Sequence, residues 1–109
     1  MKIVNIAKDF SKFPIGRNRE DGESSGEEFR DSLLFPILLD SDDEILIDMD
    51  GTEGYGNSFI EEAFGGLVRK LKKEKMPVER YISRLTFKSV VNPKYKEKAL
   101  DAINNAKNS

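Results

Sequence analysis

Residues 44–75 contain a strand pattern, a glycine-rich loop and a long helical pattern in immediate succession. The uninterrupted apolar triplet at 45–47 is typical, by its length and branching, of a strand buried on both faces. From Ser58, apolar residues recur at the helical period until a basic last turn at 70–75: Phe59, Ile60, Ala63, Phe64, Leu67, Val68 and Leu71. A strand that feeds such a helix indicates an α/β fold with right-handed crossovers. We expect this strand to lie centrally in the sheet.

The remaining segments predict the rest of the fold. Branched apolar residues favour strands at 2–7 and 85–91, and a shorter extended piece at 13–17 suggests an edge hairpin. Helical patterns occupy about 26–35 or beyond, with an end or a kink at Pro36, then a short turn at 77–84 and a final helix after Asn92-Pro93. We therefore expect one domain, 1–109, in the order β-β-α-β-α-β-α. Its mixed sheet would have four strands, or five in the alternative, with helices packed on it.

Composition excludes several kinds of site. The chain has no cysteine and no histidine, so thiolate and imidazole metal sites are impossible and carboxylates or hydroxyls must carry any chemistry. A net charge of -2 generates no general attraction to nucleic acid or to an anionic membrane. The basic run 70–75 is most simply a solvated helix end. No leader-like segment is evident, and no apolar run approaches the roughly 20 residues that span a bilayer. We expect a cytoplasmic protein.

The segment LIDMDGT, with Asp48 and Asp50, resembles the motif of haloacid-dehalogenase-like phosphatases. This resemblance implies a magnesium-dependent enzyme in which Asp48 attacks a phosphoryl group and Asp50 exchanges its proton. The family also requires a downstream acidic pair, and no paired aspartates follow Asp50. The two aspartates are then more simply the end of a strand and the start of a turn.

Two further blocks resemble a bacterial STAS-like family of unknown function over about residues 10–90. One is GxSFxEEAFGGLV, and the other is an upstream GRx3DGxxSGxxFR block that runs from Gly16 to Arg30. STAS domains include anti-sigma factor antagonists, in which a Ser or Thr at the start of a helix is phosphorylated. The resemblance implies a non-enzymatic regulatory module without a cofactor. It also implies a protein partner such as a histidine-kinase-type ATPase or an anti-sigma-like protein.

By that resemblance Ser58 lies near the switch position, after Asn57, where better-known members carry Asp. A phosphate at a helix start would gain hydrogen bonds from unpaired N–H groups. The alternative is structural, because Ser58 and Glu61 match a capping box. Nearby acidic residues would repel a phosphate: Asp48, Asp50, Glu53, Glu61 and Glu62.

The predicted partner-binding surface runs from Asp50 to Glu62 and includes the loop 16–26 as a second candidate. Tyr55 lies between two glycines and, if exposed, is a reasonable interface anchor. Arg17 and Arg30 flank the loop, where they either bind an anion or neutralise its acidic residues. We expect that the two arginines neutralise the acidic residues of this loop and its end, which are Glu20, Asp21, Glu23 and Glu27.

Overall fold

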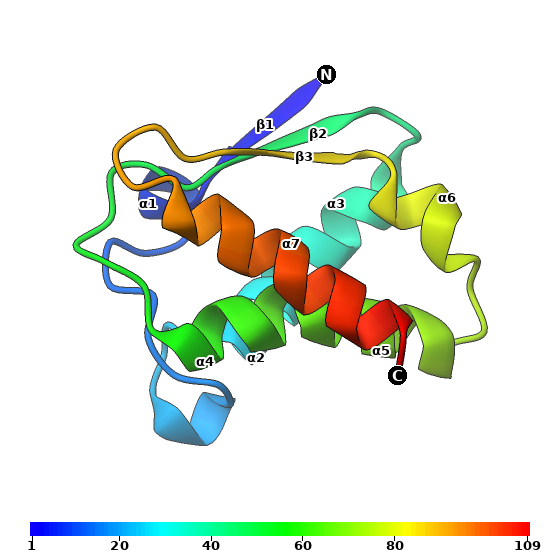
Figure 1. Ribbon diagram of the computed structural model, residues 1–109, viewed down its shortest axis with the longest axis horizontal. Helices are drawn as coiled ribbons and strands as arrows, with labels where there is room; N and C mark the ends of the chain where they lie inside the picture. Colours follow the sequence, from blue (N-terminus) through cyan, green and yellow to red (C-terminus); the bar gives the residue numbers. More distant parts are fainter.

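A computed structural model describes residues 1–109 and shows an α/β fold built on one parallel sheet. Its three strands are β1 (Lys2–Asn5), β2 (Ile45–Asp48) and β3 (Leu85–Lys88), in the spatial order β1-β2-β3 (Figure 1). The central position predicted for the strand at 45–47 is therefore confirmed. All three strands run in one direction, so their carboxyl ends meet at one edge of the sheet.

The predicted mixed sheet of four or five strands is wrong, because residues 13–17 form no strand. Pro14 has no N–H to offer a sheet ladder, and Gly16 has φ +99, outside the strand region. The carbonyls of this segment accept hydrogen bonds from loop and helix-start amides instead. The first strand also ends early, because the Asn5 side chain accepts the Lys8 N–H and caps the short helix α1 (Ile6–Asp9).

Two long helical runs follow β1 and β2. The first consists of α2 (Gly26–Phe29), the π-helical η2 (Arg30–Leu34) and α3 (Phe35–Asp40). The second consists of α4 (Asn57–Ile60), the π-helical η3 (Glu61–Gly65) and α5 (Gly66–Lys73). The first run continues through Pro36 to Asp40, although an end or kink was expected there. It does so after a wider turn in which the Phe35 N–H donates to the Arg30 carbonyl.

The other elements are the 3-10 turn η1 (Arg19–Asp21), the short helix α6 (Val78–Ile82) and the last helix α7 (Lys94–Lys107). Both helices agree with the predicted ones. No helix in the structure combines the length and the apolar character that crossing a bilayer requires.

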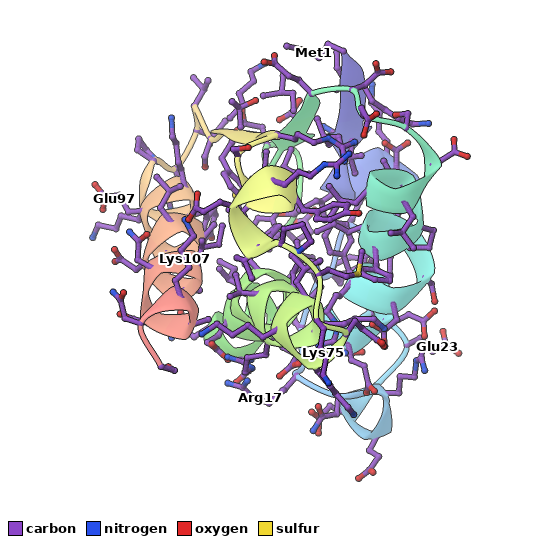
Figure 2. All side chains as sticks on the ribbon, turned by 90° about the vertical axis from the view of Figure 1, so that its right-hand side faces the viewer. Met1, Arg17, Glu23, Lys75, Glu97 and Lys107 are labelled. Atoms are coloured by element: carbon purple, nitrogen blue, oxygen red, sulfur yellow. The ribbon has the colours of Figure 1, made fainter.

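The long helices all lie on one face of the sheet, and side chains fill the space between the two layers (Figures 1 and 2). Phe29, Phe59 and Phe64 form the centre of this core, and Phe64 meets Phe87 of β3 edge to face. The opposite sheet face is open to solvent, with Ile3 61% exposed and Leu46 partly exposed, so the predicted burial of the strand at 45–47 on both faces is wrong. Burial on one face therefore orients β2, and the helix that follows β2 begins at the carboxyl edge of the sheet.

Candidate functional site at the start of α4

The loop 49–56 carries the chain from the central strand into α4. It leaves the carboxyl edge of the sheet, where open α/β folds commonly bind ligands. Gly51 and Gly54 have φ angles of +98 and +127, a region that favours glycine, so the loop depends on both residues for its path.

Asp48 and Asp50 hold this loop through backbone hydrogen bonds. The Asp50 carboxylate accepts the N–H groups of Val90 and Val91 at 3.0 to 3.1 Å, which ties the loop to the turn after β3. Asp48 Oδ1 accepts the Asp50 N–H at 3.0 Å. No group of three or more carboxylates in the structure is placed to hold a metal ion. The two aspartates thus have the strand-end and turn roles that were the simpler interpretation of DMDGT.

Tyr55 anchors the loop from the inside. Its hydroxyl donates to the Met49 carbonyl at 2.9 Å, and its ring contacts Tyr95 edge to face with centroids 4.7 Å apart. Burial raises the pKa of the Tyr55 hydroxyl well above its usual value. Only part of the ring reaches solvent, so the condition under which Tyr55 was expected to act as an interface anchor is met only in part.

Ser58 lies exposed within the first turn of α4, directly after the exposed Asn57. The N-cap is Gly56, and no side chain caps the helix, so the predicted capping box of Ser58 with Glu61 is wrong. The helix begins two residues earlier than that motif requires, and Glu61 binds arginines instead. The Ser58 hydroxyl is consequently not used to cap the helix.

Three arginines converge on Glu61 and Glu62. Arg17 Nη1 donates to Glu61 Oε1 at 2.6 Å and to Glu62 Oε1 at 2.9 Å. Arg69 pairs with Glu61 at 2.9 and 3.0 Å, and Arg30 Nη1 donates to Glu62 Oε2. We call these five residues, with Asp31 and Lys70, the ionic network.

Asp31 and Lys70 extend this network. Arg30 Nε donates to Asp31 at 2.8 Å, and Lys70 Nζ lies 3.0 Å from the same carboxylate oxygen. Arg17 and Arg30 are therefore neutralised, as expected, but by other residues than those predicted, which were Glu20, Asp21, Glu23 and Glu27. Neutralisation comes from the second long helix and from Asp31, because the two helical runs pack side by side.

A glycine permits this close packing. A Cβ added at Gly26 would lie only 2.6 Å from the Phe59 carbonyl oxygen and 3.0 Å from the Ala63 amide nitrogen, both of them backbone atoms. The upstream and downstream sequence blocks therefore meet in space, with Gly26 from one block against the first turns of α4 and η3 in the other.

Residues 25–95, more than half of the chain, match the family model of the STAS-like domain of unknown function (DUF4325). The chain belongs to this STAS-like family. No curated protein and no solved structure matches it. The family resemblance predicted from the two blocks is thereby confirmed. The matched region includes both long helical runs and the loop between β2 and α4, whereas Arg17 lies before it.

Arg17 and Arg69 both pair with Glu61 in this STAS-like domain. Hydrogen bonds from Arg69 outweigh the opposing effect of partial burial and, with those from Arg17, lower the pKa of Glu61 to about 2. Hydrogen bonds from Arg30 and then Lys70 likewise lower the pKa of Asp31. The Glu61 carboxylate, one turn beyond Ser58, is therefore charged but already paired with arginine.

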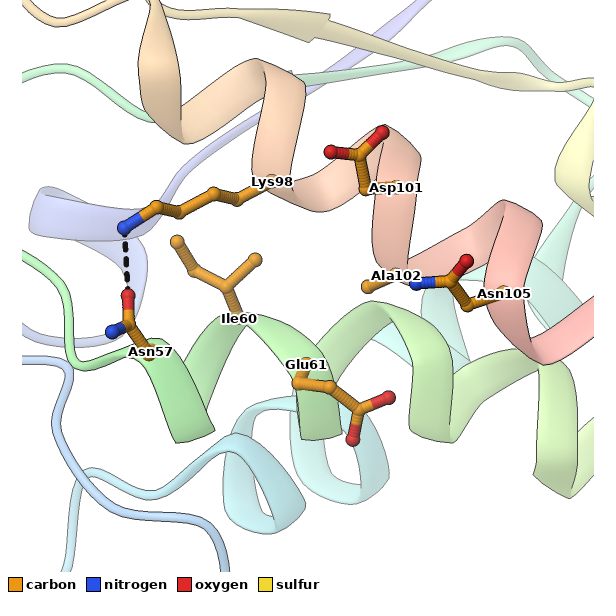
Figure 3. A pocket seen from close by; sticks show the side chains of 7 residues that line it. All are labelled: Asn57, Ile60, Glu61, Lys98, Asp101, Ala102 and Asn105. Carbon is orange, nitrogen blue, oxygen red and sulfur yellow. Dashed lines mark hydrogen bonds between the residues drawn. The ribbon is translucent and has the colours of Figure 1, made fainter.

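A groove of about 290 Å³ lies between the start of α4 and α7 (Figure 3). Its lining consists of Asn57, Ile60, Glu61, Lys98, Asp101, Ala102 and Asn105. Lys98 reaches across from α7, and its ammonium donates to Asn57 Oδ1 at 2.7 Å. The Lys98 ammonium thus lies beside Asn57, the residue that precedes Ser58. Lys98 follows Asn57 by 41 residues, so sequence spacing could not indicate this contact.

A second groove of about 330 Å³ is lined in part by residues 53–56 of the loop. We call it the apolar groove, and its lining consists of Phe13, Ile15, Glu53, Gly54, Tyr55, Gly56 and Tyr95. Phe13 and Ile15 are each 60% exposed, an unusual state for side chains of this size. The predicted surface from Asp50 to Glu62 includes residues 53–56 of this groove. The contribution of Phe13 and Ile15 was not predicted, because residues 13–17 were assigned to a strand.

Proposed function

We propose that this STAS-like domain is a non-enzymatic, cytoplasmic regulatory module that binds a protein partner at the start of α4. Phosphorylation of Ser58 would control the binding. A partner kinase would transfer the γ-phosphoryl group of ATP to Ser58 Oγ, releasing ADP and the hydroxyl proton. The partner class follows from the STAS resemblance: a histidine-kinase-type ATPase or an anti-sigma-like protein.

The proposal rests above all on the position of Ser58. Its side chain is exposed in the first turn of a helix that continues from Asn57 to Lys73 at the carboxyl edge of the sheet. A phosphate at such a position interacts favourably with the helix dipole and places about two negative charges on the surface. The modification would therefore change a docking surface without disturbing the core.

The acidic residues near Ser58 repel a phosphate at that position less than their number suggests. Glu61 and Glu62 are paired with three arginines, and Asp50 faces backbone N–H groups. Lys98 adds a positive charge beside Asn57. Each of these contacts reduces the repulsion that a phosphate on Ser58 would meet.

The test measures binding of the purified protein to histidine-kinase-type ATPases from the same organism. Ser58→Glu is expected to weaken binding about tenfold, because it introduces charge into the centre of the contact. Ser83→Glu is the matched control, since Ser83 is an exposed serine at the far end of α6. Unchanged affinity of the Ser58→Glu variant, with its circular dichroism spectrum intact, would remove Ser58 from the mechanism.

A further inference from the structure

Residues 12–17 run alongside the loop that leads into α4, and we call them the strap. The Lys12 carbonyl accepts the Glu53 N–H at 2.8 Å, and the Pro14 carbonyl accepts the N–H of Gly56, the N-cap, at 3.1 Å. The approach is close, since a Cβ at Gly56 would lie 3.5 Å from the Ile15 Cα. The strap is therefore attached directly to the start of the helix that carries Ser58.

The same segment is attached to the first long helical run. The Gly16 carbonyl accepts the Gly26 N–H at 2.9 Å, and the Arg17 carbonyl accepts the Glu27 N–H at 3.0 Å. These are amides of the first turn of α2, which no intrahelical carbonyl can satisfy. The strap thus connects the starts of both long helices, and a displacement of its last residue would affect both.

Arg17 can leave the ionic network without leaving a carboxylate unpaired. Without it, Glu61 retains Arg69 and Glu62 retains Arg30, so neither carboxylate becomes unpaired. Arg30 is far more constrained, with 12% of its side chain exposed against 39% for Arg17. The Arg17 guanidinium can therefore exchange one partner for another while the network persists.

The network can also accept a further anion. Its four cationic side chains face three carboxylates, which leaves one positive charge in excess. Ser58 precedes Glu61 and Glu62 by three and four residues. On a helix this spacing brings side chains to within about 5 to 6 Å at Cβ. A charge on Ser58 would act on Arg17 across a single helical turn.

We propose that the Arg17 side chain responds to a charge on Ser58 and that its movement displaces the strap. When Ser58 carries a phosphate, the Arg17 guanidinium moves from Glu61 and Glu62 to the phosphate, one turn toward the helix start. The strap moves with it, and its exposed Phe13 and Ile15 alter the apolar groove. This inference rests on the proposed phosphorylation of Ser58 and gives that event a route to a second, apolar part of the partner surface.

The experiment uses the full chain with phosphoserine installed at position 58 during translation, so that no kinase is needed. The phosphate is titrated by phosphorus NMR in the wild-type background and with Arg17→Gln. A neighbouring guanidinium stabilises the dianion, so the pKa of the phosphate is expected to be about half a unit lower when Arg17 is present. Arg17→Lys retains the charge and is expected to give a value between those two.

Arg19→Gln is the matched control, because it removes the same charge from the same loop at a residue that pairs with Glu28. It should leave the phosphate pKa at the wild-type value. Amide exchange supplies a second readout: phosphorylation should change the protection of Gly56 and Gly26, which donate to strap carbonyls, and Arg17→Gln should abolish that change. Equal phosphate pKa values with and without Arg17 would overturn the inference.

Failure of this inference is distinguishable from failure of the proposed function. Partner binding that responds to phosphoserine, together with a phosphate pKa independent of Arg17, overturns the sensing role and leaves the switch intact. A pKa that depends on Arg17, together with unchanged partner binding, supports the sensing role and overturns the switch.

Discussion

Two acidic pairs, Asp48 with Asp50 and Glu61 with Glu62, lie 11 to 14 residues apart in this chain, and the structure uses them in opposite ways. Asp48 and Asp50 accept hydrogen bonds from backbone amides of their own turn and of the turn after β3. Glu61 and Glu62 accept hydrogen bonds from arginine side chains that come from the strap, the first helical run and α5. One pair closes a loop, and the other joins separate elements.

The difference determines which pair can take part in regulation. A carboxylate that accepts backbone N–H groups can change partners only if the turn itself opens. A carboxylate shared between two arginines can lose one and remain paired, because the second stays in place. The Glu pair therefore offers a rearrangement of low cost, whereas the Asp pair fixes the path of the chain into α4.

The largest effect is expected from removing the charge of Glu62. Glu62→Gln should lower the free energy of unfolding by about 2 to 3 kcal/mol, because the largely buried Arg30 then loses one of its two carboxylates. Chemical denaturation at pH 7 measures the change. Glu79→Gln is the control, since Glu79 is 74% exposed and pairs only with Lys107. Equal stability of the two variants would mean that the ionic network contributes little to the free energy of unfolding.

A smaller loss of stability is expected from substitutions in the pair of Asp48 and Asp50. Asp50→Ala removes the acceptor of the Val90 and Val91 amides and should cost about 1 to 2 kcal/mol. Hydrogen exchange at these two amides should rise in parallel. Asp48→Asn preserves an oxygen for the Asp50 N–H and should stay within about 0.5 kcal/mol of wild type. If Asp48→Asn were the more damaging substitution, the turn would depend on negative charge rather than on acceptor geometry.

Local patterns were sufficient to predict much of the fold. The α/β class, the central strand at 45–47 and the helix that follows Asn57 all arise from apolar spacing within a single segment. The element types depend on the apolar pattern of the segment itself, whereas the burial of the strand depends on which faces of the sheet the helices cover. The exposed position of Asn57 and Ser58 also agrees with the surface predicted for them.

Features that depend on distant partners were not predictable. The strap was expected to be a strand, but its carbonyls accept the N–H groups of Gly26, Glu27 and Gly56 rather than those of a neighbouring strand. Likewise Arg17 lies among acidic residues in sequence and binds Glu61 and Glu62 in space. One available signal was Gly26, because a glycine in the first turn of an amphipathic helix suggests a close neighbour.

The smallest expected effect concerns Glu61, whose partners are more exposed. Its pKa of about 2 lies below the value of an unfolded glutamate, so its pairing stabilises the fold above pH 4.5. This contribution declines as the pH falls toward 2, where the folded carboxylate also takes up a proton. Solvent screening limits it to about 1 kcal/mol.

Other carboxylates titrate in the same range, so the contribution must be isolated by subtraction. Arg69→Gln removes the principal cause of the lowered pKa, and denaturation curves of this variant and wild type are compared at pH 7 and at successive steps toward pH 2. The difference in unfolding free energy should be largest at neutral pH and should shrink with acidification. A difference that persists undiminished at pH 2 would show that Arg69 stabilises α5 by packing, and that the Glu pair is held by Arg17 and Arg30 alone.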